Sequence, residues 1–188
     1  MKGLRTFIGV FPPPDLIATL SRIQSSLKVD SSPVRWENSE KLHVTLKFLG
    51  DLSPEEGQKL REAMLAGGFT FPRFTVLINR LGCFPLVGAP RTIWIGSTAG
   101  ENSELAKCSM HLETLCASIG LKKEKRDFHP HITLGRVKGK LSALLIKSIE
   151  NTNFEPIEFL CTELLVMKSD LSPTGSAYSQ LYSIPLSL

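Results

Sequence analysis

The stretches HVTLKFLG (residues 43–50) and HITLGRV (residues 131–137) decide the fold of this chain. In each, apolar residues alternate with polar ones and a glycine follows, a pattern that predicts a β-strand. Because successive side chains of a strand point to opposite faces, each histidine shares a face with the threonine two positions later. Each strand therefore has an apolar face that can pack under a helix and a polar face that carries an imidazole and a hydroxyl.

A second pair of similar stretches has nearly the same spacing along the chain. LRTFIGV (residues 4–10) resembles PRTIWIG (residues 90–96), and each precedes its H-x-T-L strand in the same order. Two short motifs repeated in one order predict an internal duplication within a single domain, residues 1–188, with H-x-T-x motifs at 43–46 and 131–134.

The remaining pattern predicts alternating strands and helices. We expect strands at 5–11, 42–50, 73–84, 91–96, 131–137, 157–167 and 177–186, helices at 16–27, 53–65, 102–120 and 141–152, and a turn-rich loop at 169–178. The predicted fold class is α+β: two pseudo-symmetric lobes of mainly antiparallel sheet, with helices on the outside and a central cleft.

Composition limits the possible partners. The 188 residues are 42% hydrophobic and 21% charged, which excludes a disordered or coiled-coil chain, and the net charge of +4 is too small for extensive coating of a nucleic-acid backbone. No apolar run is long enough to span a membrane. The four cysteines form no C-x-x-C pair, so we expect reduced thiols and a cytoplasmic protein.

The polar faces of the two motifs carry the expected chemistry. His43 and Thr45, like His131 and Thr133, lie about 6.6 Å apart along a strand, close enough to reach oxygens of one phosphate. A twofold relation between the lobes would bring both pairs to one cleft. In-line phosphodiester cleavage needs a base and an acid on opposite sides of phosphorus, and two histidines can supply both without a metal. These residues alone do not say which histidine is the acid.

The paired motifs, together with LGCFP, FHPHITLGR and SPTGSAY, resemble the two-histidine (2H) phosphoesterase superfamily, in particular its 2′-5′ RNA ligase-like branch, the RNA 2′,3′-cyclic phosphodiesterases. The resemblance implies that His43 is the proton donor and His131 the proton acceptor that activates water. It also implies opening of an RNA 2′,3′-cyclic phosphate to a 2′-phosphate, with reversible 2′-5′ ligation as a second reaction.

Three further residues are candidates for substrate binding. The guanidinium of Arg136 matches phosphate geometry, although strand alternation turns it away from His131 unless Gly135 hosts a bulge. Lys47 shares a face with His43 by the same alternation and could add positive charge to the cleft. Phe48 could stack on a base, although alternation points it toward the core, and Tyr178 is a similar aromatic candidate.

Several alternatives remain open. His129 and His131 form an H-x-H pair of the kind that binds metals, but no second ligand cluster accompanies it, so we expect no metal and no cofactor. The protein could instead be an RNA-end binding module without turnover, or a phosphodiesterase for a small cyclic-phosphate metabolite. We expect RNA ends carrying a 2′,3′-cyclic phosphate as partner, no obligate protein partner, no membrane association and a monomer.

Overall fold

The computed structural model describes residues 3–85, 88–100, 103–172 and 175–188. The strands are β1 (Leu4–Val10), β2 (Val34–Trp36), β3 (Val44–Leu52), β4 (Phe74–Ile78), β5 (Arg80–Phe84), β6 (Thr92–Gly96), β7 (His131–Val137), β8 (Ile157–Cys161), β9 (Glu163–Ser172) and β10 (Gly175–Pro185). The helices are α1 (Pro14–Ser26), α2 (Pro54–Ala63), α3 (Glu104–Ser118) and α4 (Ala143–Asn151), with short helical turns at Ser39–Lys41 and Met64–Gly68.

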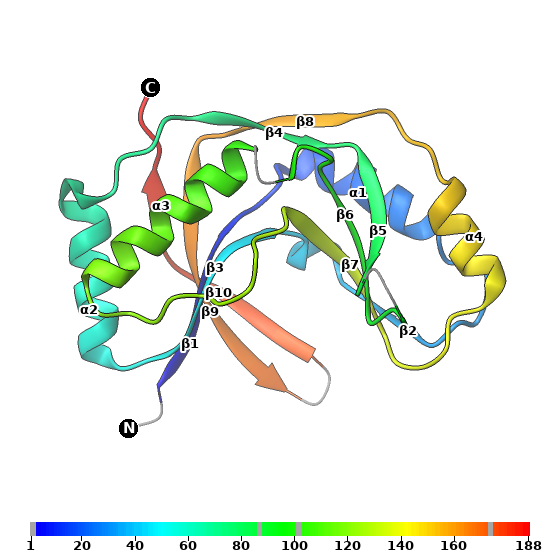
Figure 1. The fold of residues 1–188 in the computed structure, drawn as a ribbon, viewed down its shortest axis with the longest axis horizontal. Helices are drawn as coiled ribbons and strands as arrows, with labels where there is room; N and C mark the ends of the chain where they lie inside the picture. Colours follow the sequence, from blue (N-terminus) through cyan, green and yellow to red (C-terminus); the bar gives the residue numbers. More distant parts are fainter. Residues whose placement is uncertain (1–2, 86–87, 101–102, 173–174) are drawn as a thin grey trace.

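Two lobes of antiparallel sheet lie side by side (Figure 1). The strand order is β10-β9-β1-β3-β7-β6-β5, with β2 paired to β7, and the lobes meet where Val44 of β3 pairs with Ile132 of β7. The ribbon of β4 and β8 runs along one side of both lobes. The α+β class with mainly antiparallel sheet and helices on the outside is confirmed, and one continuous hydrophobic cluster contains residues of both lobes.

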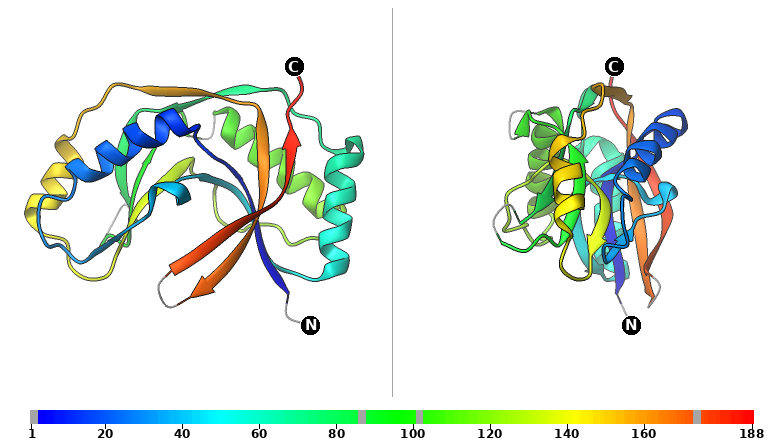
Figure 2. Two further views of the ribbon diagram at one scale, coloured as in Figure 1. Left: turned by 180° about the vertical axis from the view of Figure 1, so that it is seen from behind. Right: turned by 90° about the vertical axis from the view of Figure 1, so that its right-hand side faces the viewer.

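The helices cross between the halves of the chain. α1 follows β1 yet lies beside the lobe of β5, β6 and β7, whereas α3 follows β6 and packs on β3 (Figures 1 and 2). Each histidine strand is therefore supported by a helix from the other half of the sequence. Among the described helices, none is long and apolar enough to cross a membrane.

Local sequence signals explain several element ends. Ser53 caps α2 through a capping box with Glu56, and Pro54 occupies the first turn, as expected from SPEE. The expected strand 73–84 is divided into β4 and β5 at Asn79. The expected loop 169–178 is wrong at its ends, because β9 continues to Ser172 and β10 begins at Gly175; residues 173 and 174 of that loop lie outside the described part.

Candidate functional site

A cleft of about 1200 Å³ lies between the two lobes, and side chains from both line it. The structure brings together the four residues expected to carry the chemistry: His43 and Thr45 come from the β3 side, and His131 and Thr133 come from β7. Arg136, Lys47 and Phe48 also border this space.

The imidazole of His43 is held on all sides. Its Nδ1–H donates to the carbonyl of Lys41 at 2.6 Å, which leaves Nε2 as the reactive nitrogen, 3.0 Å from the hydroxyl of Thr45. The ring stacks between Phe7 and Phe11, with centroid distances of 4.8 and 5.0 Å, and Tyr178 from β10 meets it edge-on at 5.3 Å. The three aromatic rings fix the plane of the imidazole, and the hydrogen bond to the carbonyl of Lys41 fixes its tautomer.

His131 has the same tautomer in a different frame. Its Nδ1–H donates to the carbonyl of His129 at 2.7 Å, so Nε2 is again the nitrogen available for chemistry. Phe84 meets the ring edge-on at 5.1 Å, and Trp94 lies 6.5 Å away. The Nδ1 of each histidine thus bonds to the carbonyl two residues earlier in the chain, a local contact that the two motifs share.

Burial is the main influence on the titration of both histidines. It lowers the pKa of His43 below its ordinary value, and the carbonyl of Lys41 and the carboxylate of Glu37 oppose that shift while the charges of His131 and Arg136 add to it. Burial likewise lowers the pKa of His131, against the carbonyl of His129. Burial therefore favours the neutral form of both rings, and a bound anion would favour the charged form of either.

A β-bulge in each motif changes which side chains face the cleft. On β3, Ile8 pairs with Lys47 and Gly9 with Thr45, so Leu46 is an extra residue in the register. On β7, Ile93 pairs with Gly135 and Trp94 with Thr133, so Leu134 is the extra residue. Both H-x-T-L motifs thus carry the bulge at the leucine.

The first bulge overturns the alternation expected for Lys47 and Phe48. Phe48 pairs with Phe7 and lies on the cleft side, where its side chain is 52% exposed. Lys47 pairs instead with the core residue Ile8 and is 2% exposed. The expected faces of both residues are wrong for one reason, because the inserted Leu46 reverses the alternation after Thr45.

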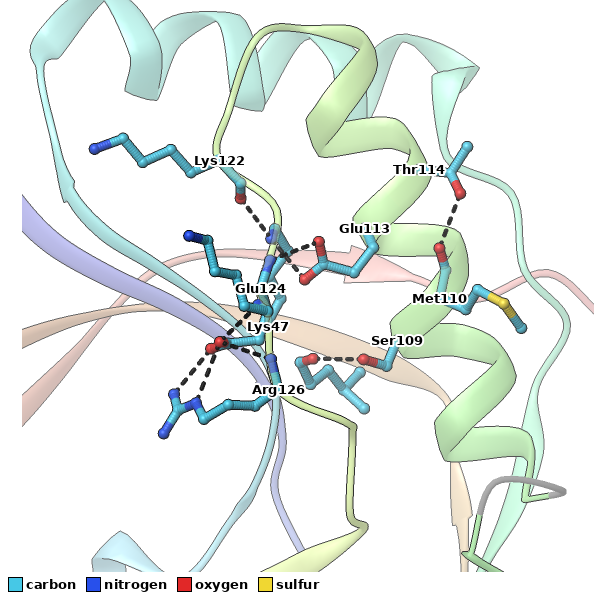
Figure 3. A network of polar contacts seen from close by, with 10 residues as sticks. Lys47, Ser109, Met110, Glu113, Thr114, Lys122, Glu124 and Arg126 are labelled. Atoms are coloured by element: carbon cyan, nitrogen blue, oxygen red, sulfur yellow. Dashed lines mark hydrogen bonds and ion pairs between the residues drawn. The ribbon is translucent and has the colours of Figure 1, made fainter.

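The ammonium of Lys47 binds protein groups. It donates to the carboxylate of Glu113 on α3 at 2.7 Å and to the carbonyl of Lys122 at 3.1 Å, and the other oxygen of Glu113 accepts from the amide of Glu124 (Figure 3). A buried cation is stable only with such partners. Since these lie on α3 and in the segment that leads toward His131, the contacts of Lys47 hold both against β3. The charge expected to serve the substrate is thereby neutralised within the protein.

The second bulge turns Arg136 into the cleft. Arg136 pairs with Thr92, on the same face as Trp94 and therefore as Thr133. Alternation alone predicted that Arg136 turns away unless Gly135 hosted a bulge; the register contains a bulge, one residue earlier, at Leu134. The guanidinium is 48% exposed and its Nε–H donates to the carboxylate of Glu37 at 3.2 Å.

Several cleft residues have no signal in the sequence. Glu37 follows the short strand β2, which the pattern did not predict because three residues are too few to show alternation. Phe7 and Phe84 belong to predicted strands, but their contacts with the histidines depend on pairing between distant segments. Tyr178, one of the weaker aromatic candidates, contacts His43 across the hairpin of β9 and β10.

The two histidines of the H-x-H pair have different surroundings. Both histidines border the cleft. The carbonyl of His129 accepts from the Nδ1–H of His131, and its ring lies beside Phe84, with a centroid distance of 5.8 Å. Within the described ranges, no group of three or more histidine, cysteine, aspartate or glutamate side chains is placed to hold a metal ion.

Two antiparallel lobes, each carrying one H-x-T motif toward a shared cleft, define the class of two-histidine phosphoesterases. A family model described as LigT like Phosphoesterase matches residues 10–94 and 97–178, and this chain belongs to that family.

Individual relatives agree with this assignment. The chain is 30% identical over 171 residues to a protein of Aeropyrum pernix named RNA 2′,3′-cyclic phosphodiesterase, covering 90% of this chain and 96% of that one. It is 31% identical over 180 residues to a protein of the same name from Thermotoga maritima, covering 95% and 94%. A crystal structure of Escherichia coli LigT complexed with 3′-AMP has the same fold, with a TM-score of 0.77, 23% identity and 99% coverage of both chains.

Proposed function

We propose that this protein hydrolyses RNA 2′,3′-cyclic phosphodiester ends to 2′-phosphomonoesters by metal-independent acid/base catalysis. The observation that carries the proposal is the pair of histidines lining one cleft. Each donates its Nδ1–H to a backbone carbonyl, which leaves Nε2 as the nitrogen for proton transfer, and the Nε2 of His43 contacts the hydroxyl of Thr45. The names of the relatives from Aeropyrum pernix and Thermotoga maritima support the RNA cyclic phosphate as substrate.

In the proposed reaction, neutral His131 takes a proton from water through Nε2 as the water oxygen attacks phosphorus. The bond from phosphorus to the 3′-oxygen breaks, and protonated His43 delivers its Nε2 proton to that oxygen. The product carries a 2′-phosphate and a free 3′-hydroxyl, and proton exchange with solvent restores both rings. The order of the two roles is the one that the family resemblance implies; at His43, burial lowers the pKa, and the carboxylate of Glu37 opposes that shift.

The other polar groups of the cleft hold the phosphate. The hydroxyl of Thr45 donates to the Nε2 of neutral His43; once that nitrogen is protonated, the hydroxyl can donate to a non-bridging oxygen. Thr133, which also lines the cleft, has the equivalent place in the second motif. Arg136 can exchange its contact with Glu37 for the phosphate, because guanidinium binds phosphate oxygens in pairs. Phe48, exposed at the rim, can stack on the terminal base.

The same residues could act in reverse. If a 5′-hydroxyl of a second RNA replaced water, exchange of the acid and base roles would give a 2′-5′ linkage, and we include this reversible ligation as a minor activity. We further propose that residues 1–188 form a single, internally duplicated domain that works as a monomer in the cytoplasm, where its four cysteines, free in the structure, stay reduced.

The deciding experiment is turnover of a short RNA ending in a 2′,3′-cyclic phosphate, with and without EDTA, followed by identification of the product end by ³¹P NMR. We expect a 2′-phosphate, unchanged rates with EDTA, and a bell-shaped dependence of kcat/KM on pH. A 3′-phosphate product or loss of activity with EDTA would contradict the proposal. Binding without turnover would indicate an RNA-end binding module, and turnover restricted to a mononucleotide cyclic phosphate would indicate a small-metabolite enzyme.

A further inference from the structure

The two bulges share a second feature, which lies beneath the cleft. The carbonyl of each bulged leucine accepts a hydrogen bond from a polar side chain buried in the core. Ser109 on α3 donates to the carbonyl of Leu46 at 2.7 Å, and Gln24 on α1 donates to the carbonyl of Leu134 at 2.9 Å. These donors are 4% and 6% exposed, and Figure 3 shows Ser109 reaching β3 from its helix.

A bulge needs such a contact because its extra residue has no partner across the ladder. Hydrogen bonds to a buried carbonyl stabilise the backbone conformation that presents it. The hydroxyl of Ser109 on the carbonyl of Leu46, and the amide of Gln24 as one of two donors to the carbonyl of Leu134, therefore favour the bulged strand over a regular one. In a regular strand, alternation would return Phe48 and Arg136 to the face opposite their histidines.

Gln24 makes one contact more than Ser109. Its amide also donates to the carbonyl of Glu37 at 2.7 Å, and the backbone amide of Glu37 donates to the carbonyl of Leu134 at 2.9 Å. One buried side chain therefore holds both the bulge that aims Arg136 and the residue whose carboxylate meets Arg136 in the cleft.

We propose that Gln24 and Ser109 are positioning residues, each of which holds the bulge that turns a substrate-facing side chain into the cleft: Arg136 for Gln24, and Phe48 for Ser109. Gln24 is not among the residues that line the cleft, whereas Ser109 borders it from α3, 4% exposed, with its hydroxyl on the carbonyl of Leu46. The contacts are crossed, since α1 of the first half serves the second motif and α3 of the second half serves the first.

The first test measures the backbone and does not depend on activity. We expect Gln24→Met, which removes the donor at similar volume, to speed amide hydrogen exchange in β7 and to leave β3 as in the wild type, and Ser109→Ala to do the reverse. Ser109→Thr, which keeps the hydroxyl, should behave as the wild type. Equal acceleration in both strands, or none in either, would overturn the proposal.

The second test uses double-variant kinetics and rests on the proposed function. On a cyclic-phosphate RNA, Gln24→Met should lower kcat/KM about tenfold, the effect of losing one charge-assisted contact, and should have little further effect once Arg136 is alanine. Ser109→Ala should lower it about fivefold and have little further effect once Phe48 is alanine. The crossed pairs should be additive, and additivity in the matched pairs would overturn the proposal.

The controls separate positioning from general destabilisation. Ser26→Ala on α1 and Ser118→Ala on α3 remove hydroxyls that donate to carbonyls of their own helices, and neither should change exchange in β3 or β7. If the wild type turns over no cyclic phosphate, the proposed function fails while the exchange test still decides the positioning roles. If Gln24→Met does not fold, Ser109→Ala, which removes a single oxygen atom, decides by the same two measurements.

Discussion

The two halves of the cleft have the same backbone arrangement but carry different side chains at one equivalent position. Each has histidine, threonine and a bulged leucine in the same order, and the second residue after the bulge faces the cleft in both. In the first half that residue is Phe48, and in the second it is Arg136. The same bulge therefore presents an aromatic side chain in one lobe and a cationic one in the other. Under the proposed function, Phe48 would meet the base and Arg136 the phosphate of the RNA end.

The histidines differ in enclosure as well. His43 lies between two phenylalanine rings with its Nε2 against Thr45, while His131 meets Phe84 only by its edge. Two H-x-T-L motifs can therefore have histidines with different roles. The surroundings of each ring come from neighbouring strands, which belong to distant parts of the chain.

The largest effect on activity is expected from removing each histidine in turn. We expect His43→Ala and His131→Ala each to lower kcat on a cyclic-phosphate RNA by about 10²- to 10⁴-fold, because neither ring can perform the role of the other. His111→Ala, which removes an imidazole packed on Phe69 and away from the cleft, is the matched control and should keep full activity. If one of the two cleft variants kept wild-type kcat, a single histidine would suffice and the two-residue mechanism would be wrong.

Lys47 tests the claim that the residue after the bulge faces the core. Lys47→Met should lower the free energy of unfolding by about 2 kcal/mol, since Glu113 and the carbonyl of Lys122 lose a charged donor. KM for the RNA should change little. Urea unfolding and steady-state kinetics on the same preparation check both, with Lys59→Met at an exposed helical ion pair as control. A large rise in KM at unchanged stability would indicate instead that Lys47 binds the substrate.

The sequence predicted most of the elements, and the four histidine and threonine residues that line the cleft, because their signals are local. Alternation, a proline in the first turn and a capping serine are each contained in a few neighbouring residues. The bulges were not predictable in this way, since the donors for Leu46 and Leu134 come from helices 63 and 110 residues away. One inserted residue then reversed the expected faces of Lys47 and Phe48 together.

Arg136 and Phe48 provide a finer comparison. Arg136→Ala should lower kcat/KM about tenfold for mononucleotide and oligonucleotide cyclic phosphates alike, because both carry the phosphate. Phe48→Ala should have an effect of about fivefold that depends on the terminal base, greater for purines, because stacking area decides it. Equal dependence on the base in both variants would contradict separate phosphate and base ends.

The smallest expected effect is on stability against pH. Both histidines have a pKa below the ordinary value in the folded protein, and about 6.5 when unfolded. Below that pH the unfolded chain binds more protons, so stability present above about pH 6.5 is lost as the pH falls through the folded pKa values. Denaturant unfolding at pH 7.5 and 5.5 should show a smaller loss in His131→Ala than in the wild type. An equal loss would mean that the ring of His131 titrates normally in the fold.

The crossing of α1 and α3 has a consequence for how the chain could be divided. A fragment ending at Phe84 would contain His43, Thr45 and the bulged Leu46, but the serine that holds that bulge would be on the other fragment. The complementary fragment would lack Gln24 in the same way. Neither piece could assemble half of a working cleft by itself, so we expect split fragments to regain activity only when mixed.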